Sequence, residues 1–274
     1  MQAAAAEGPK RSMMTLNLKQ RHALVCGASG GIGAATARLL ADLGASVTVV
    51  ARREALLKTV CEGLDRSHGQ NHQYLAADFS RPDDAREQLQ AHLQQSPAQI
   101  LINNSGGPAP GPIVSADGED FLNGMRAHLV CNQYLTQAAL PGMRQAGYGR
   151  IINIISTSVY EPIPGLGVSN TVRAAVAAWA KTLSAELAPE GFTVNNVLPG
   201  FTATDRLDSL IRGRAEKAGV ADDEIAEGMR RSVPMGRFAS AEEVANAIAF
   251  LASPAASYIT GISLAVDGGR LKSL

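Results

Sequence analysis

The sequence predicts an α/β protein in which a parallel β-sheet is covered by helices on both faces. Short apolar and β-branched runs alternate with longer helical segments along the 274 residues. The strand-like runs are apolar at successive positions, which is typical of strands buried on both sides. No change of composition and no Pro/Ser-rich linker divides the chain. Because such alternation gives parallel strands joined by helical crossovers, we expect one doubly wound domain of about seven strands.

The expected elements follow one another in regular alternation. Strands are expected at residues 23–26, 46–50, 73–77, 100–102, 150–155, 193–198 and 262–266. Helices are expected at residues 32–43, 53–64, 82–95, 121–143, 168–187 and 242–252. The second strand is almost entirely β-branched, and Gly44 is a stop signal for the first helix.

Two segments lie outside this alternation. Residues 1–18 are Ala-rich and then basic, and they lack the continuous apolar core of a signal peptide. We expect a flexible extension there and the folded domain at 19–274. Residues 201–236 contain no strand, and 207–231 read as charged helix. A segment of that length without a strand predicts a substrate lid. The alternative is a solvated pair of helices at the periphery of the domain.

Composition narrows the function classes. Apolar residues make up 46% of the chain and charged residues 18%, which excludes general disorder. The 25 basic residues balance the 25 acidic ones, so no electrostatic argument favours nucleic acid or a membrane surface. Cys26, Cys61 and Cys131 fit no metal spacing, and their sparse number fits a reducing compartment. We expect no metal site from these cysteines, and no membrane-spanning helix, because no apolar run approaches ~18 residues.

A glycine-rich turn is the first motif with chemical meaning. The string Gly27-Ala28-Ser29-Gly30-Gly31-Ile32-Gly33 lies between the first strand and the first helix. Glycines let the backbone turn sharply and let a pyrophosphate approach the main chain, where the helix N-terminus offers free N–H groups. Such a string alone can be an ordinary turn, but its position after a strand and before a helix predicts a nucleotide site.

The ends of the next strands predict which nucleotide binds. An acidic residue closing the second strand would bind the adenosine ribose 2′-hydroxyl, but that strand ends in Arg52 and Arg53. Arginine forms charge-assisted bonds with phosphate, so we predict NADP(H), with NAD(H) as the alternative. Asp78 closes the third strand and is expected to accept from the adenine amino group. The segment 103–106 closes the fourth, at the edge where open sheets bind ligands.

Several motifs in a fixed order now carry a family resemblance. They are Gly27-x-x-x-Gly31-x-Gly33, Asn103-Asn104-Ser105-Gly106, Asn195-Asn196-Val197-Leu198-Pro199-Gly200 and Val266-Asp267-Gly268-Gly269. Over about residues 19–269 the chain resembles the short-chain dehydrogenase/reductase family, and within it the 3-oxoacyl-carrier-protein reductases. The resemblance implies a Rossmann-type fold, a nicotinamide cofactor, no metal, a cytoplasmic location and assembly as a homotetramer or dimer.

The resemblance also implies the cofactor contacts. These are Gly27, Ser29, Gly30, Gly31, Ile32, Gly33, Arg52, Arg53, Asp78, Phe79, Asn104, Ser105, Gly106, Arg173, Pro199, Gly200, Thr202 and Thr204.

The sequence departs from the family pattern at the catalytic positions. Ser156 matches the catalytic serine after the fifth strand, whereas Ser169 stands at the tyrosine position and Arg173 at the lysine position. His128 stands at the position of a helix asparagine. A serine hydroxyl is far less acidic than a phenol of pKa ~10, so Ser169 is a poor general acid. Arg173 stays charged and can bind ribose hydroxyls.

Three other proton donors remain open from the residues alone. His128 is chemically suited because imidazole titrates near pH ~6.5, although it can equally be a hydrogen-bonded helix histidine. Tyr160 is also suited, but its spacing from Ser156 is more typical of an aromatic residue at the edge of the substrate pocket. Water held by Ser156 is the third route.

We therefore expect an NADP(H)-dependent oxidoreductase with an atypical proton relay. It would act on a carbonyl/alcohol pair such as a 3-oxoacyl compound or another hydrophobic ketone. The alternatives are a catalytically silent NADP(H)-binding sensor or scaffold, and a non-redox lyase or isomerase that uses the same pocket.

Overall fold

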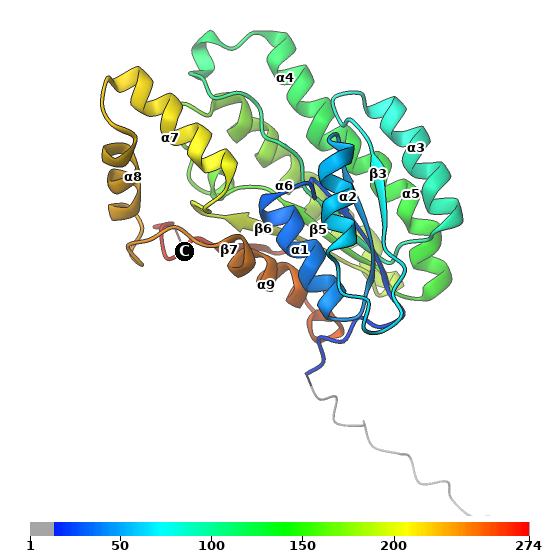
Figure 1. The fold of residues 1–274 in the computed structure, drawn as a ribbon. Helices are drawn as coiled ribbons and strands as arrows, with labels where there is room; N and C mark the ends of the chain where they lie inside the picture. Colours follow the sequence, from blue (N-terminus) through cyan, green and yellow to red (C-terminus); the bar gives the residue numbers. More distant parts are fainter. Residues whose placement is uncertain (1–13, 274) are drawn as a thin grey trace, which may run out of the picture.

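Seven parallel strands form the sheet at the centre of the computed structural model, which describes residues 14–273 (Figure 1). The strand order is β3-β2-β1-β4-β5-β6-β7, so the doubly wound Rossmann-type fold is confirmed. The order reverses between β1 and β4, which opens a crevice at their carboxyl ends. The strands are β1 His22–Cys26, β2 Ser46–Ala51, β3 Gln73–Ala76, β4 Ile100–Asn103, β5 Arg150–Ile154, β6 Thr193–Pro199 and β7 Ser263–Val266.

Helices cover both faces of the sheet and bury one apolar layer on each side. The first layer contains α1 Gly31–Asp42, α2 Glu54–Glu62 and α9 Ala241–Ala252. The second contains α3 Pro82–Gln95, α5 Cys131–Ala146 and α6 Gly167–Leu187. Leu40, Leu57 and Ile248 are fully buried in the first layer, and Leu89 and Met143 lie in the second. This two-sided burial explains the continuous apolar strands in the sequence.

The long helix expected at 121–143 is instead divided. Helix α4, Gly118–Met125, begins at a capping box between Asp117 and Asp120. A π-helical turn, Arg126–Val130, follows it and leads directly into α5. The π turn divides two α-helical segments while the chain stays helical from Gly118 to Ala146, which residue periodicity does not reveal. It turns His128 inward, where only 2% of the residue is exposed.

A row of side-chain amides links the strands β4, β5, β6 and β7. Asn103 donates to Asn153 at 2.9 Å, Asn153 donates to Asn196 at 3.0 Å, and Asn196 donates to the Ser263 hydroxyl at 3.1 Å. The row crosses from β4 to β7 inside the protein. Because buried amides are costly without partners, it fixes the relative register of these strands and of the loops that follow them.

The lid segment forms two helices, α7 Asp205–Ala218 and α8 Asp222–Arg231. They lie beyond the carboxyl ends of the strands and pack on each other through Leu207, Ile211, Ala226 and Met229 (Figure 1). Its role as a lid stays a prediction.

The expectation of a flexible extension at 1–18 needs a correction at its end. Leu18 is fully buried, because its apolar side chain packs in the core layer that contains α1. Its backbone amide donates to the Leu43 carbonyl at 2.8 Å. Residues 1–13 lie outside the described residues. Within 14–273, no helix combines the length and apolar character that crossing a membrane requires.

Candidate functional site

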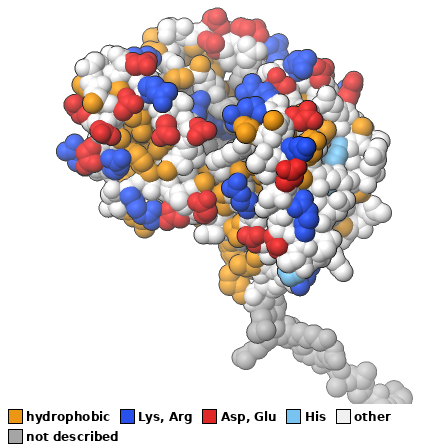
Figure 2. All heavy atoms as spheres, in the orientation of Figure 1, with side chains coloured by type: hydrophobic (Ala, Val, Ile, Leu, Met, Phe, Trp, Pro, Cys, Tyr) orange, Lys and Arg blue, Asp and Glu red, His pale blue; other side chains and the backbone are white. Residues whose placement is uncertain are grey.

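A pocket of about 740 Å³ lies at the carboxyl ends of the strands, between the glycine turn, the strand-end loops and α7. Figure 2 shows the hollow on this face, with basic side chains at its rim. Its size is in the range of small-molecule and cofactor sites. The expected cofactor residues that line it are Gly27, Ser29, Gly30, Gly31, Ile32, Arg52, Arg53, Asp78, Phe79, Asn104, Ser105, Gly106, Arg173, Pro199, Gly200, Thr202 and Thr204.

Two positions of the glycine turn have no room for a side chain. Gly27 has φ +61°, and a Cβ there would lie 2.6 Å from the Asn104 carbonyl oxygen. Gly33 does not line the pocket, because it packs on the turn and a Cβ there would collide with the carbonyl oxygen of Gly27. Gly30 instead faces open space, with nothing within 4 Å of its Cβ position. The turn is therefore a close-packed cradle with one open side.

The N-terminus of α1 favours an anion in this cradle. No side chain caps the helix, and its first turn contains no acidic residue. The first amide N–H groups of a helix lack partners within the helix and carry its positive dipole end. Thr204 from the lid segment lies 3.2 Å from the Cβ position of Gly31, so the segment after β6 closes over the turn. The residues present fit the pyrophosphate of a dinucleotide.

Two arginines and one carboxylate line the pocket beside β2 and β3. Arg53 donates to the Ser29 hydroxyl at 3.2 Å, and among the described residues neither Arg52 nor Arg53 forms an ion pair. Burial raises the pKa of Asp78, but the hydrogen bonds from the Ser80 amide and hydroxyl outweigh it and hold that pKa below its usual range. Both bonds reach Oδ1, so Oδ2 of an ionised carboxylate remains to accept from a ligand.

The opposite end of the pocket brings together Ser156, Ser169 and Arg173. The Ser156 oxygen accepts from the Ser158 amide at 3.1 Å, which leaves its hydroxyl proton free to donate. Ser169 lies in the first turn of α6, and its hydroxyl has no partner among the described residues. No tyrosine and no lysine is found among the described residues that line this pocket.

Arg173 is a fixed cation in the wall of the pocket. Nη1 donates to the Ile154 carbonyl at 2.9 Å and Nη2 to the Ser105 carbonyl at 3.5 Å. Burial, together with the neighbouring Arg206, lowers the pKa of Arg173 to about 10. The side chain therefore keeps its charge at neutral pH.

The other two candidate catalytic residues lie outside this pocket. Nδ1 of His128 lies 2.7 Å from the Ser105 hydroxyl, and the ring lines a neighbouring hollow behind that loop. Burial and the charge of Arg173 lower the pKa of His128 to about 3, so the ring is neutral at pH 7. Tyr160 is half exposed, and its hydroxyl lies 3.5 Å from the Ser263 carbonyl.

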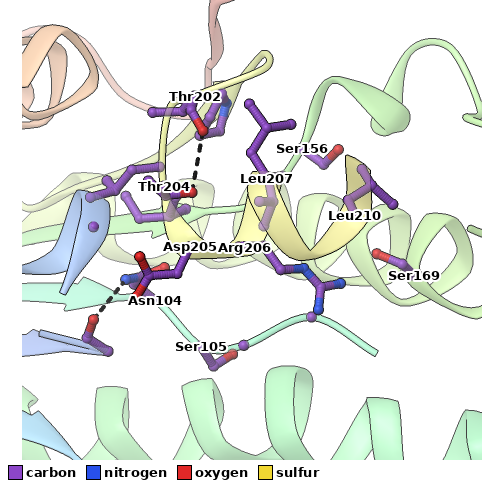
Figure 3. A pocket seen from close by; sticks show the side chains of 18 of the residues that line it. Asn104, Ser105, Ser156, Ser169, Thr202, Thr204, Asp205, Arg206, Leu207 and Leu210 are labelled. Atoms are coloured by element: carbon purple, nitrogen blue, oxygen red, sulfur yellow. Dashed lines mark hydrogen bonds between the residues drawn. The ribbon is translucent and has the colours of Figure 1, made fainter. Parts of the chain in front are cut away.

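The sequence did not single out three further arginines, Arg206, Arg214 and Arg270, that line the pocket. Arg206 lies at the start of α7 and donates to the Pro108 carbonyl at 3.1 Å. Figure 3 shows its side chain extending from α7 toward Ser169 and the loop that contains Ser105, while Leu207 and Leu210 lie on the same helix. A signal existed for Arg206: no acidic residue stands three or four positions away on its helix to pair with it.

Comparison with known proteins finds relatives that match this chain over nearly all of its length. A family model described as enoyl-(acyl carrier protein) reductase matches residues 27–270. NADPH-dependent reductase BacG of Bacillus subtilis is 33% identical over 259 residues, which cover 94% of this chain and 100% of that protein. The 3-oxoacyl-(acyl-carrier-protein) reductase FabG of Vibrio cholerae is 35% identical over 257 residues, which cover 93% and 98%.

Solved structures agree with this similarity. The crystal structure of YwfH, described as an NADPH dependent reductase involved in bacilysin biosynthesis, matches with a TM-score of 0.87 and 34% identity, covering 93% of this chain and 100% of that one. L-sorbose reductase from Gluconobacter frateurii, complexed with NADPH and L-sorbose, matches with a TM-score of 0.88 and 29% identity, covering 94% and 99%.

Proposed function

This chain belongs to the short-chain dehydrogenase/reductase family, and on that premise we propose that it is an NADP(H)-dependent oxidoreductase that reduces a hydrophobic ketone to an alcohol. One observation carries the proposal. A single pocket extends from the glycine turn and Arg52–Arg53 to Ser156, Ser169 and Arg173, so cofactor and substrate carbons can be held together there.

The cofactor end supplies complementary groups for each part of NADP(H). The glycine turn and the start of α1 would hold the pyrophosphate, Arg52 and Arg53 would hold the 2′-phosphate, and the Asp78 carboxylate would accept from the adenine amino group. NADPH-dependent relatives support this preference for the phosphorylated dinucleotide. A bound NADPH supplies the hydride that the carbonyl carbon accepts.

The substrate end supplies hydrogen bonds and charge in place of a phenol. The free hydroxyl proton of Ser156 donates to the carbonyl oxygen, and Ser169 adds a second hydroxyl from the adjacent helix. Arg173 stabilises the negative charge that develops on this oxygen, as preorganised donors and cations do in other active sites. Water held by the two serines then gives the proton.

His128 takes a positioning role in this account. A ring with a pKa of about 3 has no extra proton to give at pH 7, and it is already hydrogen-bonded to Ser105. It holds the loop after β4 against the cofactor side of the pocket. Tyr160, half exposed and outside the pocket lining, is assigned no proton transfer.

A second function follows from the same residues. Because no tyrosine or lysine is among the described residues lining the pocket, a protein that binds NADP(H) without turning over a substrate remains the alternative. The relatives do not fix a substrate, since one is named for 3-oxoacyl-carrier-protein reduction and another is bound to L-sorbose. Assembly as a homotetramer or dimer in the cytoplasm stays a prediction, which size-exclusion chromatography with light scattering and cell fractionation check.

Isotope transfer separates the two functions. The protein is incubated with NADPH deuterated at the transferred position of C4 and a panel of 3-oxoacyl thioesters, quinones and aryl ketones. The proposal expects deuterium on the carbinol carbon of at least one product, detected by mass spectrometry. Tight NADPH binding in a fluorescence titration with no deuterated product across the panel would support the silent binding protein instead.

A further inference from the structure

The pocket is lined by more basic than acidic side chains. Among residues 14–273, six arginines line it and two acidic residues do, Asp78 and Asp205. Arg52 and Arg53 lie beside the cofactor end and are accounted for by the 2′-phosphate. The remaining four, Arg173, Arg206, Arg214 and Arg270, belong to α6, α7 and the segment after β7. The proposed reduction of a neutral ketone uses Arg173 at the reacting oxygen and gives no role to Arg206, Arg214 and Arg270.

Two of these arginines meet at one point of the wall. A Cβ on Gly107 would lie 3.2 Å from Nη2 of Arg206 and 3.6 Å from Nη2 of Arg173. Both guanidinium groups therefore border the same point beside Gly107. A larger residue at 107 would fill the space between them and the loop after β4.

Neither guanidinium is neutralised by the protein. Within residues 14–273, every recorded ion pair involves other basic residues. Arg173 and Arg206 donate only to carbonyl oxygens, of Ile154, Ser105 and Pro108. Their mutual repulsion contributes to the lowered pKa of the buried Arg173. Two adjacent cations without a counter-charge are costly to hold, unless an anion joins them.

We propose that Arg206 and Arg173 bind a carboxylate of the substrate, so that the substrate class is a keto acid with an apolar body. This inference rests on the proposed function. Guanidinium groups recognise carboxylates through paired N–H donors, which makes arginine more suitable here than lysine. Because Arg173 lies one helical turn from Ser169, the carboxylate and the reacting carbonyl are separated by only a few bonds.

The rest of this end of the pocket fits the apolar body. Ile163 and Leu166 line it on one side, and Phe201, Leu207 and Leu210 line it on the lid side. The carboxylate would also connect α7 with α6, since Arg206 belongs to the lid and Arg173 to the body of the domain. Substrate binding would therefore hold the lid in place through an ion pair that is absent from the ligand-free protein.

The test compares two probes that differ in the carboxylate. Binding of 2-oxo-4-phenylbutanoate and of its ethyl ester to the NADP⁺-loaded protein is measured by isothermal titration calorimetry. Three forms are compared: the wild type, Arg206→Gln, and Arg212→Gln as a matched control. Arg212 is exposed on the same helix and does not line the pocket, so its variant removes the same charge without touching the site.

We expect the wild type to bind the acid at least tenfold more tightly than the ester. Arg206→Gln should remove that preference, Arg212→Gln should retain it, and the Kd for NADPH should be the same in all three. Equal binding of acid and ester by the wild type, or no binding of the acid, overturns the proposal.

A parallel loss of NADPH affinity in Arg206→Gln also overturns it, because the arginine would then serve a cofactor phosphate. The readout needs no turnover. A failure of the oxidoreductase function would show as missing deuterium transfer, and a failure of the carboxylate site as missing discrimination between acid and ester.

Discussion

The two ends of the pocket are built by different means. At the cofactor end, the decisive feature is backbone: Gly27 has a positive φ, Gly33 packs against it, and the uncapped start of α1 faces the open side. At the substrate end, side chains decide: Ser156, Ser169 and Arg173 supply hydroxyls and a cation. The first end has the glycine spacing expected of the family, while at the second the sequence predicts that only Ser156 matches the family's catalytic residues.

This difference shows which parts of an active site tolerate exchange. At Gly27 and Gly33 a side chain has no room, because it would meet the backbone of Asn104 or Gly27. The proposed function implies that the proton relay tolerates exchange better, since hydride transfer first requires that cofactor and substrate be held in the right geometry. We therefore expect variants at the cofactor end to affect binding and stability, and variants at the substrate end to affect turnover.

Restoring the family pair tests the substrate end with the largest expected effect. The double variant Ser169→Tyr/Arg173→Lys should raise kcat for ketone reduction by about 100-fold, the lower range for general acid catalysis. The Kd for NADPH and the melting temperature serve as controls for intact folding. An unchanged kcat in a folded double variant would show that proton donation does not limit the natural protein.

Removing the remaining family residue tests the same end in the opposite direction. Ser156→Ala should lower kcat by about 10- to 100-fold, because a donor to the developing oxyanion is lost, while NADPH binding stays unchanged. Ser158→Ala is the matched control, since the Ser158 side chain does not line the pocket and its backbone amide is kept. Equal losses in both variants would contradict the role given to Ser156.

The cofactor end is tested by adding a single methyl group. Gly33→Ala should destabilise the fold by about 1–3 kcal/mol, the usual cost of overpacking, and weaken NADPH binding by displacing the turn. Gly30→Ala should keep the stability of the wild type, because its Cβ would meet open space. Urea unfolding measures both. Wild-type stability in Gly33→Ala would mean that the turn is less closely packed than described.

The smallest effect concerns stability against pH. Burial lowers the pKa of His22, His72, His92 and His128, the last to about 3. The unfolded chain then binds more protons than the folded one below the ordinary histidine pKa, so stability present above pH ~6.5 is lost as the pH falls. His128 alone should contribute a loss of about 1 kcal/mol between pH 7 and 5.5.

Urea unfolding at these two pH values measures the loss, and His128→Asn should reduce it. Because Asn does not titrate, an equal pH dependence in wild type and variant would show that His128 is not buried in its neutral form.

The sequence predicted the cofactor end better than the substrate end, for a physical reason. Strand periodicity and glycine spacing are local properties, so the sheet and the turn could be located from adjacent residues. The division of the helix at Arg126–Val130, the inward turn of His128 and the adjacency of Arg173 with Arg206 depend on packing between distant segments. Leu18 was assigned to a flexible end because its burial in the core, and the hydrogen bond of its amide to Leu43, are not visible in its sequence neighbours.

The affinity for NADPH relative to NADH tests the central claim most directly, because it asks whether this pocket binds a phosphorylated dinucleotide. Fluorescence titration should give at least tenfold tighter binding of NADPH. The variant Arg52→Gln/Arg53→Gln should remove the difference by weakening NADPH alone, since charge-assisted bonds contribute about 1.5–3 kcal/mol. The exposed Arg38→Gln should bind like the wild type. Equal or tighter binding of NADH by the wild type would contradict the account.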